Sequence, residues 1–224
     1  MYCSETFKRL AKDKDYVVFE NTRPYNLNIW GVRSDNQKAG KFDDKLFIWT
    51  DDLFEEFTVT VDPSDLYLLN PINPLGTAII KPGQYLGLWA KGYHKGRENH
   101  PALVQRNPIV VIRDFNRDAK LDFNPIDDAD EIHIEGDVSN YYLDQELVYR
   151  THLGYFGINC HRANKYKILE LVGLHSAGCV VHQDPFRYEK EFLPLIDKAI
   201  NIWGNSFTFT LITEKELKGY INDK

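Results

Sequence analysis

Hydrophobic residues alternate with polar ones, or gather in short runs, along much of the chain. Segments of this kind that are rich in β-branched and aromatic residues are typical of strands, half-buried where they alternate and fully buried where they are continuous. Breakers such as Asn73-Pro74-Leu75-Gly76 stop helices and favour turns between them. We therefore predict half-buried strands at residues 27–32, 46–49, 57–61 and 132–134, and a fully buried strand at 109–112.

Helical periodicity lies near the two ends of the chain. The pair Asp184-Pro185 fits a helix N-cap followed by proline at the first helical position. An apolar stripe over residues 192–203 then stops at Gly204, which predicts a helix that packs on the core. Shorter amphipathic segments predict helices at residues 4–12 and after Thr213.

The chain has 224 residues, of which 43% are hydrophobic, and no internal repeat or linker divides it. We therefore predict one mainly β (β-rich α+β) domain over residues 1–224, an antiparallel β-sandwich-like fold with peripheral helices. Its 27 Lys and Arg against 33 Asp and Glu give a net charge of −6. An acidic chain lacks a continuous basic surface for phosphates, so we expect no nucleic-acid partner.

The hydrophobic runs of the chain are short. None approaches the roughly 20 apolar residues of a membrane-spanning helix, so we expect no membrane insertion. The first residues also lack the apolar core of a secretory signal, so the chain either begins in the cytoplasm or has lost a leader.

The chain has three cysteines, Cys3, Cys160 and Cys179, and this odd count leaves at least one thiol free. The orientation of Cys160 depends on whether residues 155–161 form a strand. Alternation in such a strand places Cys160 on the apolar face and His161 on the other. Cys160 is therefore expected to be a buried core thiol.

Cys179 has different neighbours, because the small residues Ser176-Ala177-Gly178 precede it and allow the backbone to turn tightly. This setting favours a nucleophile. A cysteine nucleophile needs a base, which His161 could supply, and amides that stabilise an oxyanion, which Gly178 and Cys179 could supply. We expect Ser176 to be a hydrogen-bonding loop residue, since a thiol is the more reactive nucleophile.

His161, fourteen intervening residues and then Ser176-x-Gly178-Cys179 resemble the catalytic motif of the L,D-transpeptidase family, in which His, Ser or Thr, Gly and Cys recur at this spacing. Residues 154–184 carry the resemblance, with the motif itself at 157–184. It implies the family's β-sandwich-like fold and a catalytic role for these four residues. It also implies that a backbone carbonyl orients the histidine.

The resemblance further implies a substrate and a reaction. Cys179 would attack the carbonyl of an L-configured diamino-acid residue linked to D-alanine in peptidoglycan stem peptides. The thioester acyl-enzyme would then be resolved by an amine, as in a transpeptidase, or by water, as in an L,D-carboxypeptidase or endopeptidase. The reaction requires no cofactor and would take place at the cell wall or in the periplasm.

Three positions depart from the family pattern: Arg162 replaces a glycine, Ala177 a histidine, and Val181 an arginine at the substrate end of the site. The chain would therefore be a divergent member. We expect Arg162 or His182 to substitute in space for the missing arginine. His175 is either a supporting group of this site or a solvated loop residue.

The same residues allow a competing interpretation as a metal site. His175, Cys179, His182 and His161 could hold zinc tetrahedrally, although the spacing is not that of a zinc finger. Zinc would consume the thiolate that catalysis requires, so the two hypotheses exclude each other.

A second polar constellation could hold calcium, with Asp114, Asn116, Asp118 and Asp122 at positions 1, 3, 5 and 9 of a loop. It lacks the glycine at position 6 and the glutamate at position 12, so a polar hairpin turn is the alternative. If the His/Cys cluster is structural, the chain would instead be a non-catalytic cell-wall or glycan-binding β module, with or without bound calcium.

Overall fold

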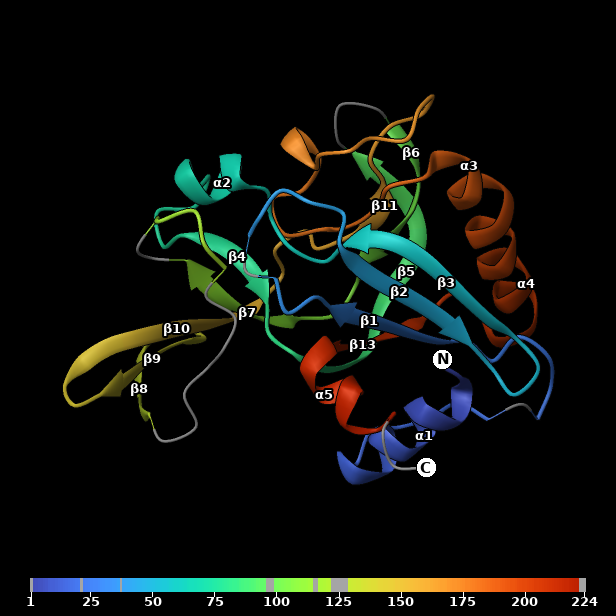
Figure 1. Cartoon of the computed structure of the whole chain (residues 1–224), viewed down its shortest axis with the longest axis horizontal. Helices are drawn as coiled ribbons and strands as arrows, with labels where there is room; N and C mark the ends of the chain where they lie inside the picture. Colours follow the sequence, from blue (N-terminus) through green and yellow to red (C-terminus); the bar gives the residue numbers. More distant parts are fainter. Residues whose placement is uncertain are drawn as a thin grey trace.

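The structure, a computed structural model, describes residues 2–20, 22–36, 38–95, 99–114, 117–121 and 129–221. It is mainly β, which confirms the predicted fold class, and its strands form two sheets (Figure 1). Eight strands close into a barrel, in the order β1-β13-β5-β6-β11-β12-β3-β2. Their bounds are β1 Asn28–Arg33, β2 Asp44–Trp49, β3 Phe54–Thr60, β5 Gly83–Lys95, β6 Asn99–Gln105, β11 Cys160–Arg162, β12 Val180–His182 and β13 Phe207–Thr213.

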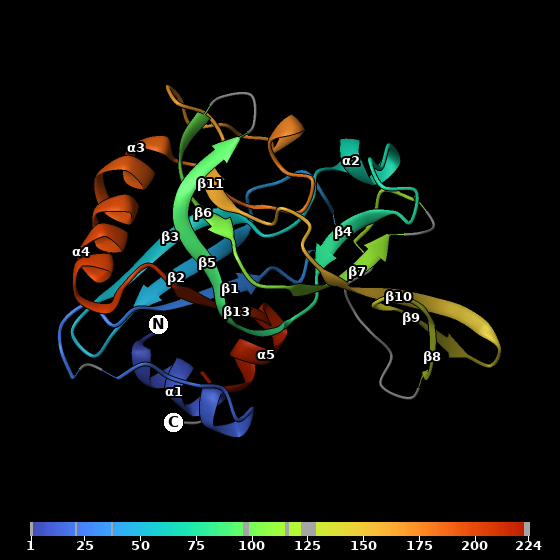
Figure 2. The same cartoon turned by 180° about the vertical axis from the view of Figure 1, so that it is seen from behind.

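The second sheet has five strands in the order β4-β7-β10-β9-β8. They are β4 Thr77–Ile80, β7 Ile109–Asp114, β8 Asp130–Glu135, β9 Val138–Leu143 and β10 Glu146–Gly154. This sheet meets the barrel at β4 and β7, while β8, β9 and the far end of β10 extend away from it (Figures 1 and 2). Ile80 and Val111 belong to the same core cluster as Trp89 of the barrel, so one apolar core joins the two sheets.

Strand β2 is apolar on both faces because both of its faces are buried. Leu46 and Ile48 join the main core, whereas Phe47 and Trp49 belong to a second cluster with residues of α1 (Ser4–Asp13) and α5 (Glu214–Gly219). Period-2 alternation therefore sends side chains into two different apolar layers, both of which are buried. Figure 1 shows α1 and α5 together beside the barrel.

The predicted helix starts and stops are confirmed by capping contacts. Asp184 Oδ1 accepts from the amides of Phe186 and Arg187, at 2.8 and 3.2 Å. The helical segment then runs to Gly204, which ends it with φ of 89°. Thr213 begins the last helix with a reciprocal capping box. The remaining helical elements are α2 Asp65–Leu69, a 3₁₀ turn at Gly173–His175, α3 Pro185–Arg187, a π turn at Tyr188–Phe192 and α4 Leu193–Trp203.

The condition of a continuous strand over residues 155–161 is not met, because the strand there is limited to Cys160–Arg162. Gly157 has φ of 71°, a left-handed conformation that interrupts a strand. The side chain of Gln105 accepts from the amides of Phe156 and Ile158, at 2.9 and 3.0 Å, in place of a neighbouring strand.

None of the helices in the described part of the chain is long and apolar enough to cross a lipid bilayer.

Candidate functional site

The parallel pairing of β11 and β12 brings the two halves of the sequence motif together. Cys160 lies opposite Val180 and His161 lies opposite Val181 in this ladder. A pocket of about 320 Å³ opens beside the two strands. Its lining residues are Tyr67, His94, His100, His161, Arg162, Ala163, Asn164, Leu174, His175, Ala177 and Cys179.

His161 is oriented by the backbone. Its Nδ1 lies 2.9 Å from the carbonyl oxygen of Arg162. A carbonyl can only accept, so Nδ1 carries the proton and Nε2 of the neutral ring keeps its lone pair. The residue is 3% exposed, and no described residue hydrogen-bonds Nε2. Burial, and next the neighbouring His94, hold the pKa of His161 well below its usual value, so the ring is neutral.

Cys179 is half-buried at the wall of the pocket. Its Sγ lies 3.4 Å from the carbonyl oxygen of Gly157, to which it donates, and accepts from the amide of Asn159 at 3.5 Å. Burial raises the pKa of this thiol to about 11, against a smaller lowering by the Asn159 amide. The resting pair is therefore a neutral thiol and a neutral imidazole, not a preformed thiolate–imidazolium pair.

The turn before Cys179 depends on glycine. Gly178 has φ of 120°, and a Cβ there would stand 2.5 Å from the carbonyl oxygen of Ala78. Ser176 Oγ accepts from the Gly178 amide at 3.2 Å and donates to the carbonyl of Cys179 at 2.9 Å. Ser176 is thus the predicted hydrogen-bonding loop residue.

These contacts distinguish the two predicted oxyanion donors. The Gly178 amide is already bonded to Ser176 Oγ, so it is not free to stabilise an oxyanion. The amide of Cys179 makes no hydrogen bond with any described residue. Of the two predicted donors, the Cys179 amide is therefore the one without a hydrogen bond to a described residue, and Gly178 shapes the turn.

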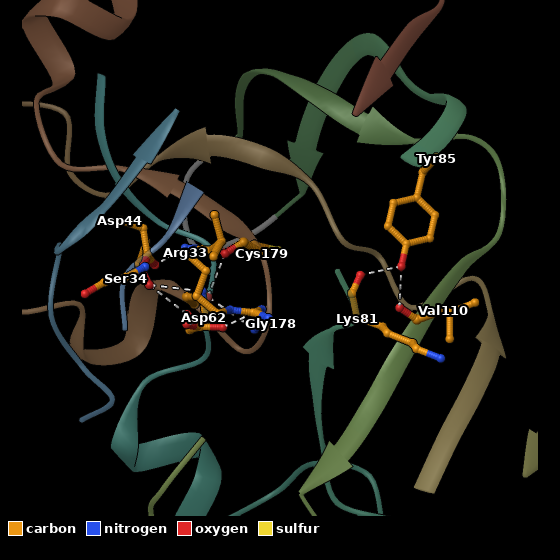
Figure 3. Close-up of polar contacts among 12 residues, drawn as sticks. Arg33, Ser34, Asp44, Asp62, Lys81, Tyr85, Val110, Gly178 and Cys179 are labelled. Atoms are coloured by element: carbon orange, nitrogen blue, oxygen red, sulfur yellow. Dashed lines mark hydrogen bonds and ion pairs between the residues drawn. The ribbon is translucent and has the colours of Figure 1, made fainter. Parts of the chain in front are cut away.

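A buried charge cluster supports this turn from the neighbouring segment. The Ser64 amide donates to the carbonyl of Ser176 at 3.0 Å. Two residues earlier, Asp62 forms an ion pair with the fully buried Arg33 at 2.7 Å. Figure 3 draws this pair together with Asp44 and the Gly178–Cys179 turn. The loop that holds Ser176 is thereby hydrogen-bonded to a segment that this ion pair anchors in the core.

Two further histidines, which the sequence analysis did not identify, also line the pocket. His94 and His100 face each other across the β5–β6 hairpin. The ring of His94 stacks on that of His161, with centroids 3.9 Å apart and an interplanar angle of 12°. The Nδ1 of His94 lies 3.0 Å from Nδ2 of Asn159. A cross-strand register brings these rings together, and only knowledge of the hairpin register could have revealed them.

Of the three predicted substrate-binding residues, the pocket includes Arg162 and His175 but not His182. The Nε of Arg162 donates to Glu189 at 3.1 Å. His182 is 1% exposed and lies in the core, where its Nε2 is 3.5 Å from Sγ of Cys160. Alternation along β12 explains this placement, because Cys179 and His182 lie on opposite faces.

The same alternation separates the residues of the competing zinc hypothesis. His182 packs against Phe57 and Phe192 in the core and does not line the pocket that contains Cys179. Within the described ranges, no group of three or more His, Cys, Asp or Glu side chains is arranged to hold a metal ion.

The predicted calcium loop is described in part. Asp114 is buried and accepts from the amide of Arg117 at 3.3 Å, and Asp118 accepts from the amide of Lys120 at 2.9 Å. These are the bonds of the alternative, a polar turn. Asn116 and Asp122 lie outside the described residues.

The pocket thus combines a thiol, a neutral imidazole with an available lone pair and a backbone amide beside the thiol. These groups are the components of cysteine-dependent acyl transfer. No protein-family model, curated protein or solved structure matches the chain.

Proposed function

We propose that the chain is a cysteine-dependent acyltransferase or peptidase, with Cys179 as nucleophile and His161 as its base. The observation that carries this proposal is the orientation of His161. Its Nδ1 is bonded to the Arg162 carbonyl, and its Nε2 has no described partner in a pocket that Cys179 also lines. A core histidine with a merely structural role would be expected to use both ring nitrogens.

The reaction follows from these groups. As Sγ of Cys179 attacks the substrate carbonyl, Nε2 of His161 takes the thiol proton, and the Cys179 amide donates to the developing oxyanion. His161 then returns the proton to the leaving amine when the C–N bond breaks, which leaves a thioester. An acceptor amine or water attacks the thioester, loses its proton through His161 and restores the thiol.

The raised pKa of the Cys179 thiol and the lowered pKa of the His161 imidazole determine at which step the proton moves from sulfur to nitrogen. Both shifts arise mainly from burial and both favour the neutral pair in the empty pocket. Proton transfer is therefore coupled to the attack on a bound carbonyl. A bound substrate also excludes water from the pocket, which strengthens the donation from the Cys179 amide.

The substrate class comes from the resemblance of the motif to the L,D-transpeptidases. We propose peptidoglycan stem peptides, attacked at the carbonyl of an L-configured diamino-acid residue that is linked to D-alanine. Of the two predicted substitutes for the missing arginine, Arg162 lies at the pocket and His182 does not.

The test is incubation of the protein with a soluble disaccharide tetrapeptide from peptidoglycan, with and without an added acceptor amine, followed by mass analysis of the products. Both reactions release alanine: a tripeptide product with a free carboxylate would identify hydrolysis, and a product in which the added amine has replaced alanine would identify transpeptidation. Cys179→Ser protein is the control, since it retains the size of the side chain and lacks the thiol. If neither product forms, or if the control forms both, the proposal is wrong and the binding-module alternative is favoured.

A further inference from the structure

A second pocket adjoins the first. It also has a volume of about 320 Å³, and Tyr67 and Ala177 line both pockets. Ala177 is exposed and stands two residues before the nucleophile. A peptide held with a carbonyl at Cys179 can therefore extend past Ala177 into this second pocket.

The second pocket contains a buried arginine. Arg113 on β7 is 2% exposed and lines the pocket. Its Nη1 donates to the carbonyl of Gly76 at 3.1 Å, and its Nη2 lies 3.0 Å from Nδ1 of His152. Its guanidinium also lies over the ring of Phe156, 4.7 Å from the centroid. All three neighbours are uncharged groups.

This guanidinium has no carboxylate partner among the described residues. Its Nε is buried and has no described hydrogen-bond partner. His152 is a neutral neighbour of the guanidinium. Burial, followed by the charge of Arg113, lowers the pKa of that imidazole. A buried cation without a counter-charge is costly, and an arginine stays protonated at neutral pH.

Two other well-buried arginines each have a carboxylate partner. Arg33 pairs with Asp62 and Arg162 with Glu189. Of these three, Arg113 is the one that lines a pocket and has no carboxylate partner among the described residues. An anion that enters this pocket would supply the missing charge and accept from the fork of the guanidinium.

We propose that Arg113 binds a carboxylate group of the peptide whose carbonyl Cys179 attacks, in the pocket formed by β4, β7 and residues 155–156. This inference rests on the proposed function for the identity of the peptide. It assigns specificity to a residue far from the motif in sequence. The ring of Phe156 and the backbone of Gly76 hold the guanidinium in place, so binding requires little reorganisation.

The test measures binding without turnover. Cys179→Ala protein is titrated with N-acetyl-D-alanine and with N-acetyl-D-alaninamide, which differ in the carboxylate, by calorimetry and by the shift in thermal midpoint. We expect the acid to bind at least about tenfold more tightly than the amide, the effect of a charge-assisted hydrogen bond. Arg113→Gln in the same background should abolish this preference.

The matched control is Arg106→Gln, which removes the same charge from an exposed arginine bonded to the carbonyl of Asn205. It should retain the preference for the acid. Arg113→Lys, which keeps the charge without the planar fork, serves if Arg113→Gln does not fold and should weaken the preference. Equal binding of acid and amide, no binding of either, or a preference retained in both Arg113 variants would overturn the inference.

These outcomes are separate from those of the proposed function, because the measurement uses a protein without the nucleophile. A preference for the acid together with an inactive wild type would reject acyl transfer and keep the carboxylate site. An active wild type without the preference for the acid would support acyl transfer and reject the carboxylate site.

Discussion

The chain carries two cysteine–histidine pairs at the same two strands, and their surroundings differ completely. Cys160 and His182 lie in the core, 3.5 Å apart from Sγ to Nε2, and are 0% and 1% exposed. Cys179 and His161 line a pocket and have no direct hydrogen bond between them. The hydrogen-bonded pair is the one that lies in the core, away from the pocket.

Under the proposed function, the opening of the thiol to a pocket and an unbonded imidazole nitrogen, rather than a direct hydrogen bond, distinguish the reactive pair from the structural one. Burial raises the pKa of the Cys160 thiol well above its usual value and lowers the pKa of His182 to about 3, so this pair stays neutral and inert. The pocket pair is also neutral at rest. It differs because Nε2 of His161 has no described hydrogen-bond partner, so under the proposed function it receives the thiol proton when a carbonyl occupies the pocket.

The largest expected effect separates the two thiols. Cys179→Ala should lower turnover of a stem peptide by at least about 10⁴-fold, because the nucleophile is lost. Cys160→Ala should leave turnover within about twofold and should mainly lower the melting temperature, since a small core side chain is removed. Steady-state kinetics and thermal melts measure both. Full activity in Cys179→Ala, or its loss in folded Cys160→Ala, would reverse the assignment.

The two histidines provide the next comparison. His161→Gln should lower kcat by about 10²–10⁴-fold at unchanged stability within about 1 kcal/mol, because a general base is removed and the ring is replaced by a polar chain. His182→Ala should lower the free energy of unfolding by about 2–4 kcal/mol, since an aromatic ring packed in the core is lost. A His182→Ala protein that is folded but as inactive as His161→Gln would contradict the account.

The pH dependence of alkylation tests the protonation state of the resting thiol. Its folded pKa of about 11 lies above that of an ordinary thiol, so the thiolate fraction at neutral pH is depressed. Iodoacetamide should therefore modify Cys179 about ten- to a hundredfold more slowly at pH 7 than an ordinary exposed thiol, allowing for the greater nucleophilicity of a more basic thiolate. The rate should keep rising with pH toward about 11.

Cys3 is exposed, so the rate at Cys179 is measured in a Cys3→Ser background. A separate Cys179→Ser protein gives the rate at Cys3, which serves as the exposed reference thiol. Hydrogen bonding to Thr6 lowers the pKa of Cys3, so this reference should react readily. A Cys179 rate that reaches a plateau below pH 8 would indicate a preformed thiolate and contradict the neutral resting pair.

The smallest expected effect concerns the turn. Gly178→Ala should cost about 2–3 kcal/mol of stability and lower turnover by about tenfold, because a Cβ meets the Ala78 carbonyl and φ is positive. Gly173→Ala is the matched control, with a positive φ of 53° and nothing within 4 Å of the added Cβ. It should cost about 1 kcal/mol and leave turnover unchanged. Equal losses of turnover in the two variants would mean that the close contact does not position Cys179.

The sequence predicted the features that depend on neighbours along the chain. The cap at Asp184, the helix led by Thr213 and the buried strand beginning at Ile109 are confirmed, because caps and alternation are local properties. The meeting of His161 and Cys179 in one pocket was also predicted, from the spacing of the motif.

Features that depend on the register of distant strands were missed. His94 and Gln105 lie on the β5–β6 hairpin and contact residues 155–161, more than 50 positions away, so nothing in their own neighbourhood marks them. The placement of His182 was open to prediction. Alternation through β12 puts His182 on the face opposite Cys179. The hypotheses that grouped these two residues considered their spacing in the sequence and not the face on which each lies.

The measurement that tests the central claim most directly is intact-mass analysis and peptide mapping of the protein after a brief reaction with the disaccharide tetrapeptide. The account predicts one thioester adduct per chain, located on Cys179, with Cys160 unmodified. It also predicts that the adduct is retained in Cys160→Ala and absent in Cys179→Ala. An adduct on Cys160, or turnover of the peptide by Cys179→Ala protein, would contradict the claim that the pocket pair carries the reaction.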